Sequence, residues 1–176
     1  MATAGLHYRE CASLPLVGAA SPRGPLLLDT NVILNALTGR GPPVLKALLA
    51  NLPQSFVSAP PVAELSWTRG VSILIIRKLP AWSPPSSRPW RGSIRAKILT
   101  PTADHWSIAG QWAGAAVRAV AGETRSFKNA ADRYEMLNDA LIAVVASEAG
   151  ISIVTQDADF DLFMQIDPAL DVLFYG

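Results

Sequence analysis

Cysteine and histidine are scarce in this chain of 176 residues, and their scarcity excludes several kinds of site. The single cysteine, Cys11, rules out an intrachain disulfide and a metal site built from cysteines, as is typical of a reducing compartment. The two histidines, His7 and His105, lie far apart in the sequence and do not have the spacing of a pair of metal ligands. We interpret each of them as an ordinary surface or helix residue.

Long apolar runs and an excess of charge of one sign are also missing. No apolar run approaches the ~20 residues that a membrane span needs, and the start of the chain is too broken in its apolar character for a secretory signal. We therefore expect a cytoplasmic protein with no membrane segment. Hydrophobic residues make up 50% of the chain and charged residues 16%, a composition that favours a globular fold with one core. The net charge of +1 argues neither for nor against a polyanionic partner.

The charges that are present are unevenly distributed. Between Leu65 and Ala103 every charged residue is basic, whereas from Asp132 to the last residue nine acids accompany Arg133 alone. The basic residues are Arg69, Arg77, Lys78, Arg88, Arg91, Arg95 and Lys97. Such a run is usually a solvated surface, but beside a carboxylate-rich centre it would suit the phosphates of a nucleic acid.

Short apolar segments alternate with segments of helical spacing along the chain. Strands are expected at 25–28, 56–59, 96–99, 151–154 and 171–175. Helices are expected at 30–37, from 43, from 60, at 102–121, at 132–149 with Asp132 as its N-cap, and just after 157. This alternation predicts an α/β fold with a parallel sheet covered by helices on both faces. Residues 1–24 are expected to be an N-terminal tail, and residues 25–176 a domain with a Pro/Ser-rich loop near 80–92.

Carboxylates follow the expected strands at positions that would bring them together. Asp29 and Asp157 each follow a buried strand, so in a parallel sheet both would emerge at the same edge. Glu64 lies in the first turn of the helix after the second strand and can reach that edge. Asp139 interrupts an apolar helix face between Leu137 and Leu141, where a charge has no evident structural purpose.

Four carboxylates in one pocket repel each other, and a hard divalent cation is the usual resolution. Ligand sets made only of oxygen suit Mg²⁺ or Mn²⁺. Such ions activate water and stabilise the transition state of phosphoryl transfer. The acids therefore predict a metal site that acts on a phosphate ester.

The blocks that contain these acids resemble a known family. They are LLLDTNVIL at 26–34, SAPPVAEL at 58–65, and NDALIAVVASEAG followed directly by ISIVTQDADF at 138–160. They are similar to the signature blocks of the PIN-domain nucleases, and especially of the VapC-like toxins of VapBC toxin–antitoxin systems. The first and last blocks are specific in combination, whereas the block around Glu64 is weak when taken alone.

The resemblance implies a fold, an activity and partners. The fold would be a three-layer α/β/α sandwich with a five-stranded parallel sheet. The activity would be that of a Mg²⁺- or Mn²⁺-dependent endoribonuclease, the toxin of a type II toxin–antitoxin system. Its partners would be the RNA substrate, a cognate antitoxin and a second copy of the chain.

The resemblance also implies roles for individual residues. The catalytic, metal-binding acids would be Asp29, Glu64, Asp139 and Asp157. Asp159 matches a further metal-binding acid of the last block. Asn31 and Thr155 match supporting polar residues that orient the carboxylates.

Other interpretations remain open at this stage. Asp29 and Asp157 are both suited to be helix N-caps, and Glu64 and Asp159 suit the positive ends of their helices. A catalytically silent PIN-like module that binds RNA or protein is the main functional alternative. A phosphatase or receiver domain fits less well, because the strand ends in D-T-N rather than D-x-D-x-T and no well-placed lysine lies near the last strand.

Overall fold

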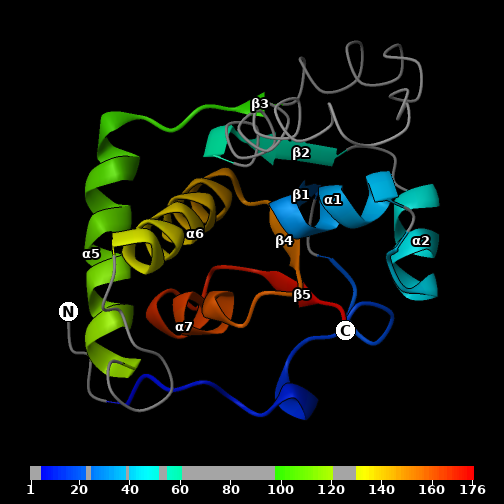
Figure 1. The fold of residues 1–176 in the computed structure, drawn as a ribbon, viewed down its shortest axis with the longest axis horizontal. Coiled ribbons are helices and arrows are strands. Elements are labelled where there is room, and N and C mark those ends of the chain that lie inside the picture. The colour runs from blue at the N-terminus through cyan, green and yellow to red at the C-terminus, as the bar shows by residue number, and fades with distance from the viewer. Residues whose placement is uncertain (1–4, 23–24, 39, 52–54, 61–97, 121–129) are drawn as a thin grey trace, which may run out of the picture.

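A parallel sheet organises the molecule. The structure, a computed structural model, describes residues 5–22, 25–38, 40–51, 55–60, 98–120 and 130–176. Within these residues the sheet has five strands in the order β3-β2-β1-β4-β5, and every neighbouring pair is parallel (Figure 1). The strands are β1 (Leu26–Leu28), β2 (Ser55–Ser58), β3 (Ile98–Leu99), β4 (Ser152–Thr155) and β5 (Val172–Phe174).

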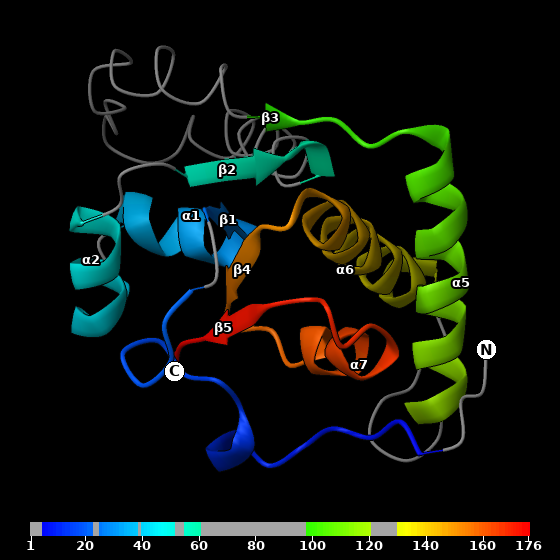
Figure 2. The same cartoon turned by 180° about the vertical axis from the view of Figure 1, so that it is seen from behind.

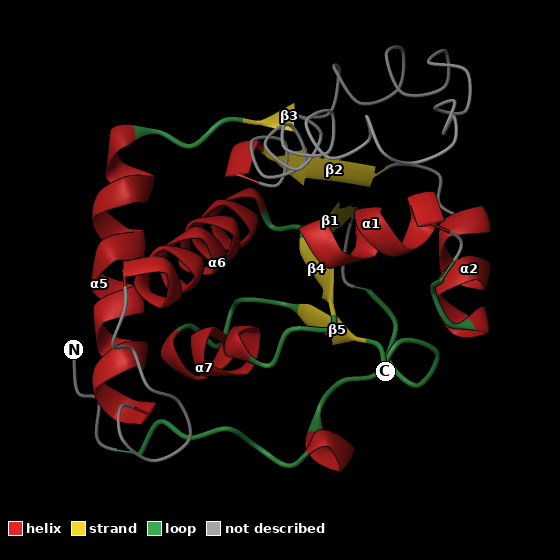
Figure 3. Ribbon diagram, viewed as in Figure 1, coloured by secondary structure: helices red, strands yellow, loops and turns green. Residues whose placement is uncertain are grey.

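Helices lie on both sides of this sheet, as Figures 2 and 3 show. Among the described residues, two short helices cover one side, and three helices, two of them long, cover the other. The first set is α1 (Thr30–Thr38) and α2 (Pro43–Ala50), and the second is α5 (Ala103–Val120), α6 (Ala130–Ala149) and α7 (Asp159–Ile166). The expected three-layer α/β/α sandwich is confirmed.

The alternation of side chains along the strands divides the core in two. Leu27 of β1 and Ile153 of β4 face the layer of α5, α6 and α7, and they join its apolar cluster. Leu26 and Val154, one residue away on the same strands, face α1 and α2 instead. Successive side chains of a strand point to opposite faces, so strands buried on both sides read as unbroken apolar runs.

Among the described residues, the helix boundaries agree with the expectations to within about a residue except at α6. The helix expected from residue 60 lies almost entirely outside the described residues. Thr102 caps α5, because its Oγ1 accepts a hydrogen bond of 3.3 Å from the backbone N–H of His105. His105 is a buried residue of α5, and its ring pairs with Glu148 of α6. However, α6 begins at Ala130, so Asp132 lies inside the first turn and the prediction that it is the N-cap was wrong. Alanines 130 and 131 are strong helix formers and extend the helix upstream.

Residues 5–20 contact the domain along the β5 edge. The backbone N–H of Phe174 donates to the carbonyl of Pro15, and that of Val17 donates to the carbonyl of Phe174, each at 2.8 Å. Leu16 thereby forms a parallel bridge with Phe174 and covers this edge of the sheet. The division into a tail of residues 1–24 and a domain of residues 25–176 stays a prediction. The 80–92 loop and the basic residues from 69 to 97 lie outside the described residues.

Candidate metal centre

Asp29 is held at the carboxyl end of β1 by two hydrogen bonds to its side chain. Its Oδ1 accepts from the backbone N–H of Thr30 at 2.6 Å, and its Oδ2 accepts from the hydroxyl of Thr155 at 2.8 Å. Its backbone carbonyl also accepts from Ile33, so Asp29 occupies the position that caps α1. The carboxylate is buried, and burial of a charge in this place is tolerated because both oxygens are hydrogen-bonded.

Thr155 connects Asp29 to the loop that follows β4. While its hydroxyl donates to Asp29, the hydroxyl oxygen accepts a hydrogen bond of 2.9 Å from the backbone N–H of Asp157. Asp157 in turn accepts, through Oδ1, the backbone N–H of Asp159 at 2.9 Å. Three predicted residues of the last sequence block are therefore fixed in one chain of hydrogen bonds that ends at Asp29.

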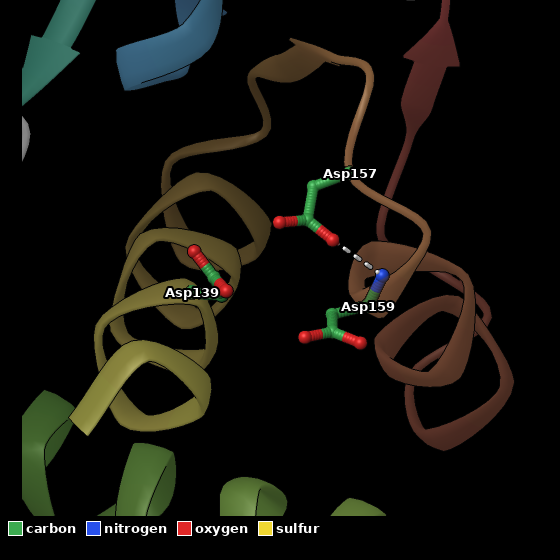
Figure 4. Close-up of side chains that lie close together, drawn as sticks. All are labelled: Asp139, Asp157 and Asp159. Atoms are coloured by element: carbon green, nitrogen blue, oxygen red, sulfur yellow. Dashed lines mark hydrogen bonds between the residues drawn. The ribbon is translucent and has the colours of Figure 1, made fainter. Parts of the chain in front are cut away.

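Asp139, Asp157 and Asp159 form the carboxylate cluster. One oxygen from each lies within 4.8 Å of the others, and Figure 4 shows them converging from α6, from the β4–α7 loop and from the start of α7. Asp139 and Asp157 are partly exposed, and Asp159 is buried. Three like charges at this separation repel each other. The donor set consists of oxygen alone and therefore fits a hard divalent cation.

The structure brings together most of the residues that the sequence singled out. The cluster contains Asp139, Asp157 and Asp159, and Asp29 adjoins it through Thr155. Asn31 lies in the first turn of α1 and is partly buried. Glu64 lies outside the described residues. The roles of all seven as ligands or supporting residues stay predictions.

A tyrosine that the sequence did not single out lies close enough to Asp29 for the charge of that carboxylate to affect its phenol. Burial raises the pKa of the Tyr175 phenol, the hydrogen bond from Asn35 lowers it, and the negative charge of Asp29 raises it further. The Nδ2 of Asn35 donates to the Tyr175 hydroxyl at 3.1 Å. The residue after β5 and the helix α1 thus both contribute polar groups near Asp29.

Two residues near the N-terminus were also missed. The hydroxyl of Tyr8 donates to Oδ1 of Asp159 at 2.6 Å, and Arg9 forms an ion pair with Asp161. The two partners in each pair are more than 150 residues apart in the chain. No local pattern in residues 5–10 indicates such a contact, so sequence periodicity offered no means of finding it.

The chain belongs to the PIN domain family, whose model matches residues 26–163. The matched region includes all three cluster aspartates and Asp29, so the family assignment and the geometry rest on the same residues. No curated protein matches the chain in sequence.

Solved structures with the same fold include two Fit structures and a VapBC2 structure. FitAcB from Neisseria gonorrhoeae is 20% identical with a TM-score of 0.55, and the match covers 84% of this chain and 96% of that one. FitAB bound to the IR36 DNA fragment is 21% identical with a TM-score of 0.53, covering 85% and 94%. VapBC2 from Rickettsia felis, bound to a DNA fragment from its promoter, is 17% identical with a TM-score of 0.50, covering 87% and 100%. At these identities the likeness establishes the fold.

Among the residues that the structure describes, none forms a helix both long enough and apolar enough to span a membrane.

Proposed function

We propose that the protein is a metal-dependent endoribonuclease that hydrolyses phosphodiester bonds of RNA. The observation that carries the proposal is the convergence of the Asp139, Asp157 and Asp159 carboxylates within 4.8 Å, with Asp29 hydrogen-bonded to the same loop through Thr155. Within the PIN domain family, this is the place where the sequence resemblance puts the metal-binding acids.

The four aspartates share one task in this proposal. Asp29, Asp139, Asp157 and Asp159 hold Mg²⁺ or Mn²⁺ through carboxylate oxygens. Thr155 holds the Asp29 carboxylate and the Asp157 backbone close to each other, because its hydroxyl forms a hydrogen bond with both. When bound, a divalent cation supplies positive charge that lowers the pKa of water and stabilises the phosphoryl transition state. On the resemblance alone, Glu64 is proposed as a further ligand and Asn31 as a supporting residue.

We further propose that the protein acts in the cytoplasm as the toxin of a type II toxin–antitoxin pair and forms homodimers. The support is the VapC-like sequence blocks, together with the shared fold of VapBC2 and FitAB, which are solved as complexes with DNA. Co-expression with the product of an adjacent small gene, followed by light scattering of the purified material, tests both the partner and the dimer. A chain that purifies alone as a monomer, and that no neighbouring product inhibits, contradicts this part of the proposal.

The nuclease activity is tested by incubating the purified protein with structured RNA and Mn²⁺ or Mg²⁺. Asp29→Asn and Asp139→Asn keep the side-chain shape and remove one charge each. We expect both to lower the cleavage rate by more than the roughly 10–100-fold that is typical of groups that only support a metal ligand. Asp104→Asn, on the exposed face of α5, is the matched control and should cleave like the parent.

The same assay separates a nuclease from a silent module. Equal cleavage by the parent, Asp29→Asn and Asp139→Asn would mean that the activity arises elsewhere. Saturable Mn²⁺ binding without RNA cleavage on any substrate would favour the catalytically silent alternative.

A further inference from the structure

The N-terminal residues reach the carboxylate cluster from a segment that precedes the first strand of the sheet. Residues 5–20 pass along α7 on the side away from α6 and then lie beside β5 (Figures 1 and 2). The side chain of Gln165 in α7 donates to the carbonyl of His7 at 2.8 Å, which fixes the backbone immediately before Tyr8. The path of this segment is thus set by contacts at both of its ends.

Arg9 anchors the backbone on the other side of Tyr8. Its backbone N–H donates to Oδ2 of Asp161 at 2.8 Å, and its Nε donates to Oδ1 at 2.6 Å. The Asp161 side chain is only 1% exposed, so these contacts take place in surroundings where water screens little. Asp161 occupies the first turn of α7, as does Asp159.

Tyr8 makes the contact that bears on the site. Its hydroxyl donates to Oδ1 of Asp159 at 2.6 Å, and its ring packs against the apolar cluster formed with α5, α6 and α7. A carboxylate has two oxygens and about four lone-pair positions, so a hydrogen bond from Tyr8 occupies one of these positions and does not prevent Asp159 from coordinating a cation. Fixing Oδ1 also fixes the rotation of the carboxylate plane, and hence the direction of the second oxygen.

We propose that Tyr8 is a positioning residue of the metal centre, which holds the Asp159 carboxylate so that it can bind the cation together with Asp139 and Asp157. The inference rests on the proposed metal-dependent function. It makes residues 5–20 a structural component of the site, clamped by Arg9 and Gln165. Removal of a group that orients a ligating carboxylate typically costs 10–100-fold in metal affinity.

The test is direct measurement of Mn²⁺ affinity by calorimetry on the full chain, with no RNA present. Tyr8→Phe removes the hydroxyl and keeps the ring, and we expect it to raise the dissociation constant by about tenfold. Tyr134→Phe, at a tyrosine that is 66% exposed on α6, is the matched control and should bind like the parent.

A double-mutant comparison separates positioning from a general loss of structure. If Tyr8 acts through Asp159, then Tyr8→Phe should change the Mn²⁺ affinity little in the Asp159→Asn background. An undiminished tenfold effect in that background would overturn the inference, as would unchanged or tighter binding by Tyr8→Phe alone. Tighter binding would mean that the hydroxyl competes with the cation.

A second measurement needs no change to Tyr8. Incorporation of 3-fluorotyrosine labels the chain's three tyrosines, and Tyr134→Phe and Tyr175→Phe identify the Tyr8 signal by elimination. Substoichiometric Mn²⁺ should broaden the Tyr8 fluorine signal, because the residue contacts a proposed ligand. A parent protein that binds Mn²⁺ and leaves this signal sharp contradicts the inference alone, whereas a parent that binds no Mn²⁺ contradicts the proposed function as well.

Discussion

The hydroxyl of Thr155, the last residue of β4, donates a hydrogen bond of 2.8 Å to Oδ2 of Asp29, which follows the neighbouring strand β1. The same oxygen accepts a hydrogen bond from the backbone N–H of Asp157. One buried side chain therefore provides a hydrogen-bond donor for a carboxylate and an acceptor for the loop after β4. Two strands that are distant in the sequence are tied together at the edge where the acids gather.

Thr155→Val should therefore destabilise the protein although it preserves shape. It removes a hydrogen bond to a buried carboxylate and the acceptor of the Asp157 N–H, and bonds to charged groups contribute about 1.5–3 kcal/mol each. We expect the free energy of unfolding, measured by urea denaturation in EDTA, to fall by about 2–3 kcal/mol. Thr102→Val at the cap of α5 is the control and should cost about 1 kcal/mol. An equal, small loss for both would show that the Thr155 bond contributes little.

Asp139→Asn should have the opposite effect on the metal-free protein. Because it removes one of three mutually repelling charges, we expect the free energy of unfolding in EDTA to rise by roughly 1 kcal/mol. Mn²⁺ at about a hundred times its dissociation constant should stabilise the parent by ~2.7 kcal/mol and this variant much less. Thermal unfolding with and without Mn²⁺ measures both. A variant that is less stable in EDTA and equally stabilised by Mn²⁺ would argue against the carboxylates acting as one site.

Arg9→Met should destabilise the fold because it leaves the buried Asp161 carboxylate without its cation. The backbone N–H of Arg9 and Gln165 still bond to Asp161, so we expect a loss of about 2 kcal/mol in the free energy of unfolding rather than the 3–5 kcal/mol of a fully broken buried pair. The double variant Arg9→Met with Asp161→Asn should recover part of this loss. No recovery would mean that Arg9 contributes by packing alone.

The raised pKa of Tyr175 predicts how the stability of the fold changes at alkaline pH. Because the pKa of Tyr175 is raised in the fold above its usual value of 10.0, its contribution to the free energy of unfolding is fully present below about pH 10 and is lost as pH rises through the folded pKa. Denaturation between about pH 9 and 11 should show a steeper decline for the parent than for Tyr175→Phe. A decline of the same steepness in both would contradict the assignment.

The two neighbours of Tyr175 allow a test with opposite signs. Asp29→Asn removes a nearby negative charge and should lower the pKa of Tyr175, whereas Asn35→Ala removes a hydrogen bond to the phenol and should raise it. Absorbance titration of the phenols in the folded proteins measures both shifts. Shifts in the same direction would contradict the opposite effects of Asp29 and Asn35 on the pKa of Tyr175.

The fold could be predicted from the sequence because its signals are local. Apolar runs such as Leu26–Leu28 and the helical spacing of α5 depend only on neighbouring residues, and parallel pairing follows from their alternation. Asp139 could be identified because a charged residue on an otherwise apolar helix face is unfavourable unless it has a function. Gly150 likewise ends α6 with a φ of 63°, which glycine adopts without strain.

The contacts of Tyr8 with Asp159 and of Tyr175 with the Asp29 region could not be predicted in this way. Each contact depends on where a terminal segment lies in space. The residues next to Tyr8 in the sequence do not indicate that the segment packs against α7. The start of α6 was misplaced for a different reason: Asp132 has the chemistry of a cap, but helix propensity at the two preceding alanines outweighed it.

The order of the strands has a consequence for the making of the protein. β1 pairs with β4, so Asp29 meets Thr155 only after 126 further residues have been added, and Tyr8 meets Asp159 only after 151. A ribosome-bound chain that stops before β4 lacks two of the three cluster acids and at least one partner of each hydrogen bond that links Asp29, Thr155, Asp157, Asp159 and Tyr8. The carboxylate cluster therefore cannot assemble early in translation, and an enzyme that attacks RNA would be inert while its own message is still being read.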